Sequence, residues 1–433
     1  MALTDELVER FKASISPELM RSRWPWLVAL ALSRSPMDRP SLRADRVSSR
    51  FMLESTRDAY LGRRPVVWSS LLFPSELIHG TGNIAFFPEI AAAKAASVGL
   101  SRRFLDAAEA AGFSQDLCSF HRVFIGAAIE DLLPHPDLLV SSSQPCDSSP
   151  LSFEFLADYY GVEHLTADVP NENSSVGELE ILAGELRRVA LALDSLDGAT
   201  GGNTGGLEER MRDAVELSNR ARRFALEVER ERKRVPSPLD GWNAMGHLAV
   251  LAMMPGTLAG ASFYAALAGE LKDDAYAGLP GKEKHRLLWM HLKPYFPSEL
   301  ETFLHEKGAV IVCEEYNRCF WGEMDPDRPF DSLAAKAAGH FSAGTAERRA
   351  AEMVRLAEEY EVDGAVHFSH RGCRQSCGSA QQVREELARV GVRTLILDGE
   401  CLDPREHRDG QIRTRLEAFL ETLDNPQTVG SAP

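Results

Sequence analysis

The chain has 433 residues, enough for two or three domains, and its 44% hydrophobic content is ordinary for a globular protein. Its 64 acidic and 48 basic residues give a net charge of -16, which repels phosphate backbones and argues against nucleic acid as a partner. The N-terminal stretch MALTDELVERFKASISPELM lacks the basic start and apolar core of a signal peptide, and no apolar run approaches the length of a membrane span. These features predict a cytoplasmic protein that is not associated with a membrane.

Residues 1–60 are predicted to form a helical N-terminal segment, anchored by Trp24 and Trp26. From about residue 61 short apolar runs alternate with helical periods, and this alternation predicts a parallel sheet covered on both faces. Strands are expected at 65–72, 137–142 and 164–170, with a further short apolar run at 85–88. Helices are expected to begin at 75 and 89 and to span 118–133 and 152–161. We place the first α/β domain at 61–235.

The glycine-rich stretch GATGGNTGG, residues 198–206, is predicted to be a linker between two long helices. It makes a poor phosphate-binding loop, because no strand leads into it and no Lys-Ser or Lys-Thr pair ends it. Residues 236–285 follow as a helical segment rich in Ala, Gly and Met. Its His247 and methionines either line a pocket or, as we prefer, pack in the core.

A second alternating segment occupies 286–433, with strands expected at 286–292, 308–315, 364–370 and 393–400 and helices expected between them. The predicted fold class is therefore α/β, with two doubly wound domains that have parallel sheets, plus the N-terminal and interdomain helical segments. Two such domains usually leave a cleft between them, with ligands at the carboxyl ends of the strands.

The chain has seven cysteines, which in a reducing cytosol argue for metal binding, redox chemistry or plain burial and against a disulfide framework. Cys118 begins a predicted helix, Cys146 lies between a strand and a helix, and Cys373 lies in the turn after the strand at 364–370. Helix N-termini carry free N–H groups and a positive dipole end, which stabilise thiolates and anionic metal–thiolate clusters. Three cysteines from two domains thus share one kind of position.

The stretch HRGCRQSCG, residues 370–378, places Cys373 and Cys377 four positions apart, where they would project from one helix face. The paired CxxC spacing of zinc sites and of thioredoxin-like pairs is absent. The third cysteine of the radical S-adenosylmethionine signature would fall on Ala380, so that interpretation fails. An iron-sulfur site is favoured, because such clusters take thiolates from wherever the fold delivers them.

Several segments, in this order, resemble the 2-hydroxyacyl-CoA dehydratase and benzoyl-CoA reductase superfamily over roughly residues 60–425. They are LLFPSELIHGTG, DLCSFHRVFIGAAIEDLL, LLVSSSQPCDSS, LEERMRDAVELSNRARR, HFSHRGCRQSCG, LILDGECLD and GQIRTRLEAFLETL. The resemblance implies two Rossmann-like domains plus helices, with Cys118, Cys146 and Cys373 holding a [4Fe-4S] cluster. It also implies an ATP-hydrolysing partner that carries its own [4Fe-4S] cluster and delivers a low-potential electron. The dehydratases of this superfamily use that electron to form a ketyl radical from a 2-hydroxyacyl thioester, and the reductases use it on an aromatic ring.

The sequence departs from the plain dehydratase pattern by having four further cysteines, Cys313, Cys319, Cys377 and Cys401. It most resembles the branch of double-cubane cluster proteins, which are homodimers and hold an [8Fe-9S] cluster with six cysteines. Under that interpretation all seven cysteines are candidate cofactor ligands, and Cys377 decides between the two cluster types. Arg371 is a second departure, since the superfamily favours an aromatic residue there. It would either stabilise a reduced cluster, attract an anionic substrate or simply face solvent.

The leading hypothesis is therefore the catalytic component of an ATP-dependent two-component reductase that acts on small inert molecules at a double-cubane cluster. Four residues near the 370–378 motif are candidates for proton transfer or hydrogen bonding: His367, Ser369, His370 and Gln375. A structural role is equally open for the two histidines. The alternatives are a [4Fe-4S] subunit of a 2-hydroxyacyl-CoA dehydratase or aryl-CoA reductase, and a non-enzymatic electron carrier or cluster-bearing scaffold.

Overall fold

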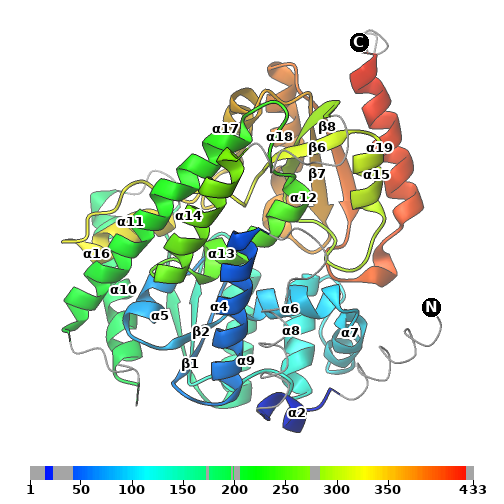
Figure 1. The fold of residues 1–433 in the computed structure, drawn as a ribbon. Helices are drawn as coiled ribbons and strands as arrows, with labels where there is room; N and C mark the ends of the chain where they lie inside the picture. Colours follow the sequence, from blue (N-terminus) through cyan, green and yellow to red (C-terminus); the bar gives the residue numbers. More distant parts are fainter. Residues whose placement is uncertain are drawn as a thin grey trace.

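Two parallel four-stranded sheets form the framework of the protein (Figure 1). The computed structural model describes residues 15–22, 42–171, 175–196, 198, 205–273 and 283–425. The first sheet has the order β2-β1-β3-β4, with β1 (Val66–Ser69), β2 (Ile84–Phe86), β3 (Leu138–Ser142) and β4 (Glu163–Ala167). The second has the order β6-β5-β7-β8, with β5 (His285–Met290), β6 (Ala309–Glu314), β7 (Gly364–His370) and β8 (Arg393–Gly399). The predicted fold class is confirmed.

The central strands are apolar because helices cover both faces of each sheet. Every residue of the central strands β1, β3 and β5 is buried, as is every residue of the edge strands β2 and β6, whereas the other edge strands, β4 and β8, are half-buried. The two sheets repeat one topology, in which the third strand returns to pair with the first. The connections of such a sheet diverge between these two strands, and ligands bind there at the carboxyl ends.

Helices cover the first sheet in two groups. One face, with the longest helices, carries α5 (Ser75–Gly80), α10 (Val176–Asp194), α11 (Leu207–Arg232), α14 (Leu258–Lys272) and α16 (Pro329–Ala338), with α4 (Arg43–Tyr60) against α14. The other face carries α6 (Pro88–Ser97), α7 (Ser101–Ala110), α8 (Ser119–Ile129) and α9 (Ser148–Tyr160). Helix α16 follows β6 in the chain, yet it packs on α10 and α11 of the first unit. The predicted boundaries at 235 and 285 stay predictions.

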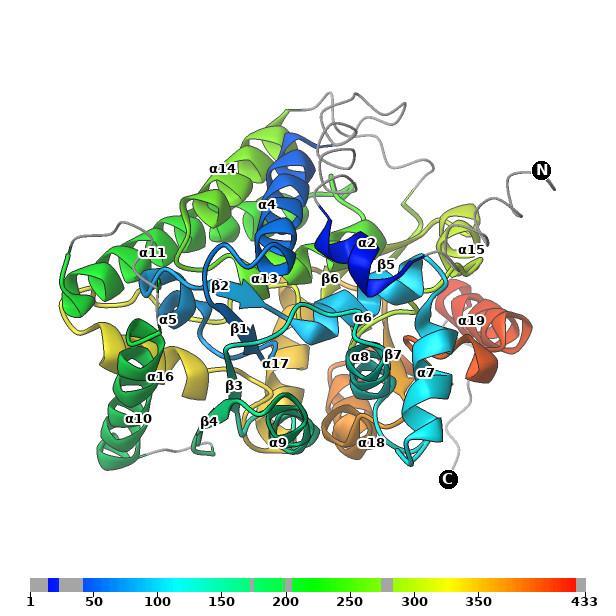
Figure 2. The ribbon, with the colours of Figure 1, turned by 90° about the horizontal axis from the view of Figure 1, so that it is seen from below.

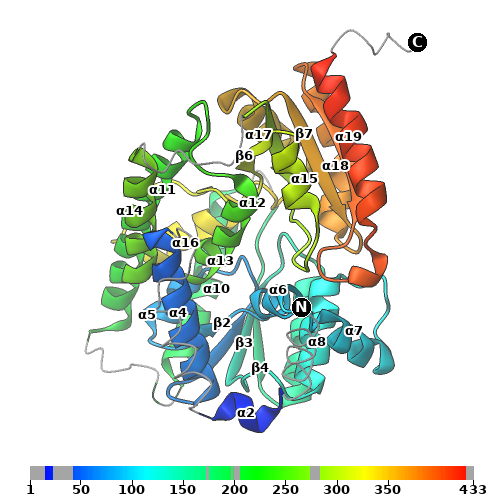
Figure 3. The ribbon, with the colours of Figure 1, turned by 45° about the vertical axis from the view of Figure 1, so that its right-hand side comes forward.

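The second sheet is covered by α17 (Ala346–Glu359) and α18 (Arg374–Arg389) on one face and by α12 (Gly241–Ala244), α15 (Leu300–Glu306) and α19 (Asp409–Asp424) on the other (Figures 1 and 3). The remaining helices are α2 (Pro17–Arg21), α13 (Leu248–Met253) and the single 3-10 turns η1 (Met245–His247) and η3 (Pro404–Glu406). One apolar core runs from Trp68 and Phe124 in the first unit to Trp289 and Phe368 in the second. The two units therefore share a core.

Some sequence predictions fall outside the described residues. Trp24 and Trp26 do, as does most of the glycine-rich stretch between α10 and α11. Within the described segments no helix combines the length and the apolar character needed to cross a bilayer. His247 packs on the ring of Phe263, its Nε2 lies 3.0 Å from Asp45 Oδ1, and it lines a cavity of about 1300 Å³ beside α4 and α6.

A buried ion pair joins α5 to α16. Lys336 Nζ donates to Glu76 Oε1 at 2.5 Å, and Ser218 Oγ donates to the same oxygen at 2.8 Å. Burial alone would raise the pKa of Glu76, but the Lys336 ammonium outweighs it and holds this pKa below 4.5. Stability from this pair is therefore fully present above the unfolded-state pKa of a glutamate and is lost as pH falls through the lower folded-state value.

We expect Lys336→Met to lower the free energy of unfolding at pH 7 by about 3–5 kcal/mol, because it leaves the Glu76 carboxylate buried without its counter-charge. The unpaired Glu76 should then have a raised pKa and take up a proton readily, so the deficit relative to wild type should shrink as the pH is lowered from 7 to 5. Urea unfolding at several pH values measures this. The double variant Glu76→Gln/Lys336→Met is the control. A deficit in the single variant that does not change with pH would contradict this account of the pair.

Candidate functional site

A cavity of about 530 Å³ lies where the carboxyl ends of the two sheets meet. Cys118, Cys146 and Cys373 all line it. Cys146 follows β3 and Cys373 follows β7, which are equivalent strands in the two sheets, each pairing with the first strand of its own sheet. Both cysteines thus lie where a doubly wound sheet binds ligands. Cys118 joins them from the N-terminus of α8.

The turn at Gly372 brings Cys118 and Cys373 together. Gly372 has a φ of +84°, and a Cβ built on it would lie 2.9 Å from the Cα of Cys118 and 3.1 Å from the carbonyl oxygen of Asp116. The backbone of the second unit therefore touches the backbone that precedes α8 in the first. Only glycine meets both the left-handed conformation and the lack of space.

Each of the three cysteines lies at a helix N-terminus, as the sequence predicts. Cys118 is the N-cap of α8, Cys373 is the N-cap of α18, and Cys146 directly precedes Asp147, the N-cap of α9. Burial raises the pKa of Cys146 to about 12 and that of Cys373 to about 11, and it also raises the pKa of Cys118 well above its usual range. The neighbouring thiols of the group add to the shift at Cys118 and Cys146, while backbone amides of the following helix oppose it. Close thiols that hinder one another's ionisation suit a cation that takes up their charge.

Two of the three sulfurs have a histidine beside them. Cys118 Sγ lies 3.3 Å from His370 Nε2, and Cys146 Sγ lies 3.7 Å from His121 Nε2. Burial lowers the pKa of His370 to about 3 and that of His121 to about 4, so both rings are neutral. The amide of Cys401 donates to His370 Nδ1 at 3.3 Å, which favours the tautomer with the ring proton on Nε2, toward the Cys118 sulfur; the carboxyl of Glu400 also lies 3.4 Å from Nδ1.

The other residues proposed from the motif lie at different depths. Gln375 lines the cavity and accepts a hydrogen bond from Tyr316. His367 lies behind the cavity, fully buried, between Arg349 and Ser376. Ser369 Oγ is 3.2 Å from Cys377 Sγ and does not line the cavity.

Arg371 points away from the site. Its guanidinium lies 3.2 Å from Glu406 and 3.4 Å from Asp116, and its side chain is half exposed. Among the interpretations that the sequence left open, this placement favours a surface ion pair that bridges the two units.

The four additional cysteines separate into two pairs. Cys377 is exposed on α18 and its Sγ donates to the carbonyl oxygen of His370, while Cys401 is fully buried behind His370. Electrostatic coupling links Cys401 to Cys118 and Cys373, and Cys377 to Cys373. Cys313 and Cys319 lie elsewhere, in the apolar cores around β6 and α16, and charged residues are their main electrostatic partners.

Three cavity residues escaped the sequence analysis: Glu89, His121 and His291. Glu89 is buried on the first turn of α6; burial raises its pKa to about 7, and its Oε2 has no hydrogen-bond partner among the described residues. His291 directly follows β5 with a φ of +68°. The position of Glu89 and His291 shortly after strands was a signal available in the sequence, whereas His121 lies within α8. The spacing of the three residues forms no motif.

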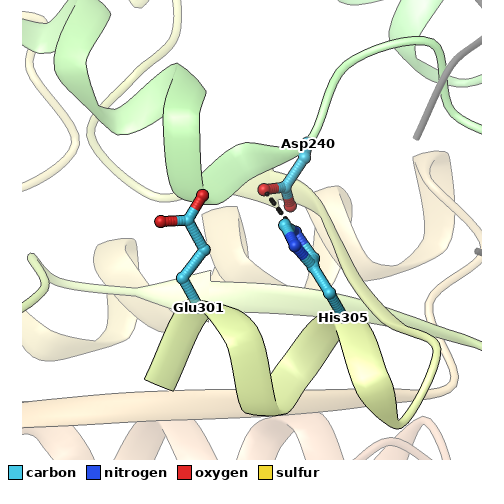
Figure 4. A group of neighbouring side chains, drawn as sticks. All are labelled: Asp240, Glu301 and His305. Atoms are coloured by element: carbon cyan, nitrogen blue, oxygen red, sulfur yellow. Dashed lines mark hydrogen bonds and ion pairs between the residues drawn. The ribbon is translucent and has the colours of Figure 1, made fainter. Parts of the chain in front are cut away.

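A second polar group lines the cavity that contains His247, and its Glu301 also lines the cysteine-containing cavity. Donor atoms of Asp240, Glu301 and His305 lie within 4.8 Å of one another, and His305 Nε2 is 3.1 Å from Asp240 Oδ2 (Figure 4). The nearby ammonium of Lys293 is the counter-charge to both carboxylates: they raise its pKa, although burial lowers it to about 8. We interpret this group as an ion-pair network that ties α15 to the segment before α12.

The fold and the site define a two-unit α/β protein with a three-thiol site at the junction of its sheets. A family model for the 2-hydroxyglutaryl-CoA dehydratase D-component matches residues 70–423. The chain belongs to this family, which confirms the resemblance inferred from the sequence.

Three relatives are components of known enzymes. The chain is 24% identical to the (R)-phenyllactyl-CoA dehydratase alpha subunit of Clostridium sporogenes, covering 83% of this chain and 89% of the relative. It is 23% identical to the (R)-2-hydroxyisocaproyl-CoA dehydratase alpha subunit of Clostridioides difficile, covering 83% and 90%. It is also 23% identical to a component of the benzoyl-CoA reductase of Thauera aromatica, covering 75% and 80%. These relatives include both dehydratases and a reductase.

We expect Gly372→Ala to destabilise the protein and to disrupt the three-thiol site. A left-handed alanine costs about 1–2 kcal/mol, and its Cβ would also push the Cys118 backbone away. Gly62→Ala is the matched control, because Gly62 has a φ of +58° with no atom within 4 Å of a built Cβ. Urea unfolding and iron content after anaerobic reconstitution measure the two effects. Equal loss in both variants would show that the contact with Cys118 has no role.

Proposed function

We propose that the chain is the cluster-bearing catalytic component of an ATP-dependent two-component enzyme, with Cys118, Cys146 and Cys373 holding a [4Fe-4S] cluster. The observation that carries the proposal is that these three thiols, from three separate chain segments, line one cavity. The donor set fits the group, because three cysteine sulfurs at helix N-termini offer soft, anionic ligands and leave one metal corner free. When bound, the cluster supplies one-electron chemistry at low potential.

The residues around the thiols have separable roles in this proposal. His370 donates its Nε2 proton toward the Cys118 sulfur, which favours a more negative, reduced cluster. Glu89 is a buried carboxyl in the lining of the cavity, with a pKa of about 7 and one oxygen without a hydrogen-bond partner among the described residues, so it is suited to transfer a proton to or from a substrate. Aromatic and apolar side chains around them, including Phe120, Trp242 and Tyr295, keep bulk water from the reacting groups.

The substrate we propose is the acyl end of a 2-hydroxyacyl-CoA or aryl-CoA thioester. A cavity of about 530 Å³ lies within the usual range for small-molecule sites. The related dehydratases and the related reductase are named for CoA thioesters. An ATP-hydrolysing [4Fe-4S] activator is the proposed electron donor. Assembly with a second copy, or with a paralogous subunit, is the proposed quaternary state.

A second candidate function is reduction of small inert molecules at an [8Fe-9S] double cubane. Cys377 and Cys401 support it, because both are electrostatically coupled to the three-thiol group. Together with Cys118, Cys146 and Cys373 they make five thiols, and a sixth would have to come from Cys313 or Cys319 in the separate cores. We therefore prefer the single cluster. A simple electron carrier is less suitable, because the thiols open into a cavity of substrate size.

Metal analysis of anaerobically purified protein tests the choice. We expect about four irons and four acid-labile sulfides per chain, and about eight irons would instead establish the double cubane. The variants Cys118→Ser, Cys146→Ser and Cys373→Ser should each lose the cluster. Cys377→Ser and Cys401→Ser should keep full iron content, with Cys313→Ser and Cys319→Ser as matched buried-thiol controls.

Glu89→Gln tests the catalytic proposal separately from cluster binding. We expect normal iron content and normal ATP-dependent reduction by the activator, seen in the electron paramagnetic resonance (EPR) spectrum. Turnover of (R)-2-hydroxyisocaproyl-CoA or benzoyl-CoA should fall by roughly 10²–10⁴, the usual contribution of a general acid or base. If wild-type protein turns over one of these thioesters and Glu89→Gln does so equally fast, Glu89 has no role in proton transfer.

A further inference from the structure

A second buried ion pair lies directly behind the site. Glu315 follows β6, and Arg349 is on the first turn of α17. Arg349 Nε donates to Glu315 Oε1 at 2.5 Å and Nη2 donates to Glu315 Oε2 at 2.8 Å, with 1% and 0% of the two side chains exposed. Burying two charges is costly, so such a pair is weak evidence for stability by itself. Its remaining hydrogen bonds indicate another role.

The other donors of Arg349 are directed at the cysteine-bearing helix. Nη1 donates to the carbonyl oxygen of Ser376 at 2.9 Å and to Ser379 Oγ at 2.6 Å, in the first two turns of α18. Cys373 is the N-cap of that helix. A guanidinium holds its donors in a rigid plane, so these bonds fix the helix start relative to the sheet.

Glu315 also accepts a hydrogen bond from the turn that follows β5, which lines the cavity as well. Glu315 Oε2 accepts the backbone N–H of His291 at 2.7 Å. His291 has a left-handed φ of +68°. A residue with a side chain adopts this conformation at a cost, so it persists only where surrounding contacts hold it. The ring of His291 lines the cavity and lies parallel to that of His370, with centroids 5.7 Å apart. Its buried Nδ1 has no partner among the described residues.

Both charges also act on Cys373 itself. Burial raises the pKa of this thiol, and Arg349 lowers it while Glu315 raises it. The two charges oppose each other at this thiol, so a change in the geometry of either one alters the field there.

We propose that the Glu315–Arg349 pair is a positioning unit for the cluster site: it sets the start of α18, with Cys373, and the turn that carries His291, both of which line the same cavity. This inference rests on the proposed function. It extends that function to Glu315 and Arg349, which do not line the cavity. Under this proposal, the ion pair influences how readily the cluster that Cys373 binds accepts an electron.

The chain contains a matched control at the preceding residue. Glu314 is the last residue of β6 and forms a pair of the same type with Arg232, at 2.5 and 2.7 Å, with 1% and 4% of the two side chains exposed. Neither residue of this pair lines the cavity, and Arg232 lies at the end of α11 rather than on a cysteine-bearing helix. If burial of an ion pair is all that matters, the two pairs should respond alike to substitution.

The experiment compares Arg349→Lys with Arg232→Lys in the full chain. Lysine keeps the charge but lacks the planar fork, so each variant should lose some stability to urea. In cluster-free protein, hydrogen exchange of the amides in residues 374–380 should speed up in Arg349→Lys alone. In iron-loaded protein, only Arg349→Lys should change the EPR line shape and shift the reduced-to-oxidised ratio at fixed potential at least tenfold, about 59 mV for one electron.

Two outcomes overturn the inference: an unchanged ratio and line shape in Arg349→Lys, or an equal shift in Arg232→Lys. If wild-type protein binds no iron, the proposed function fails and hydrogen exchange alone decides the inference. Unchanged exchange at residues 374–380 in Arg349→Lys then rejects it, and selectively faster exchange supports the positioning role without the cluster.

Discussion

The close approach of two backbones at Gly372 is the contact on which the site depends. A turn from the second unit lies against the residues that precede α8 in the first, and a single methyl group would separate them. This contact places the caps of α8 and α18 next to each other, so the thiols of Cys118 and Cys373 can share one ligand. Without it, the two sheets would each have a cysteine at a strand end but no common site.

Several independent interactions maintain this approach. The apolar core continues from the first unit into the second, and Ser119 Oγ donates to the buried Glu400 across the boundary. Arg405 pairs with Asp106 and Glu109 of α7, and Arg374 of α18 pairs with Asp147 near Cys146. Figure 2 labels α7, α9 and α18, the helices beside which these pairs form. Apolar burial supplies most of the stability, since exposed ion pairs contribute little. The charged contacts instead restrict how the units can rotate about the shared core.

The polar interior is concentrated around the cavity. His121, His291 and His370 are buried and neutral, and the pKa of Glu89 is raised to about 7. These four side chains therefore add little charge to the cavity. Of the charged groups nearby, Glu315 and Arg349 lie outside the cavity lining, whereas Lys293 and Glu301 are part of it.

The sequence by itself determined the strands, the repeated α/β order and the helix-start positions of Cys118, Cys146 and Cys373, because these follow from local periodicity and from strand-to-helix turns. Its resemblance to the family followed from ordered motifs. Only the tertiary structure decided which cysteines meet, since Cys313 and Cys401 both lie at or near strand ends and yet have different neighbours. It also revealed Glu89 and His291, whose importance depends on burial, an unsatisfied polar atom and a left-handed backbone. Those properties arise from contacts between residues far apart in the chain, and local sequence patterns do not encode them.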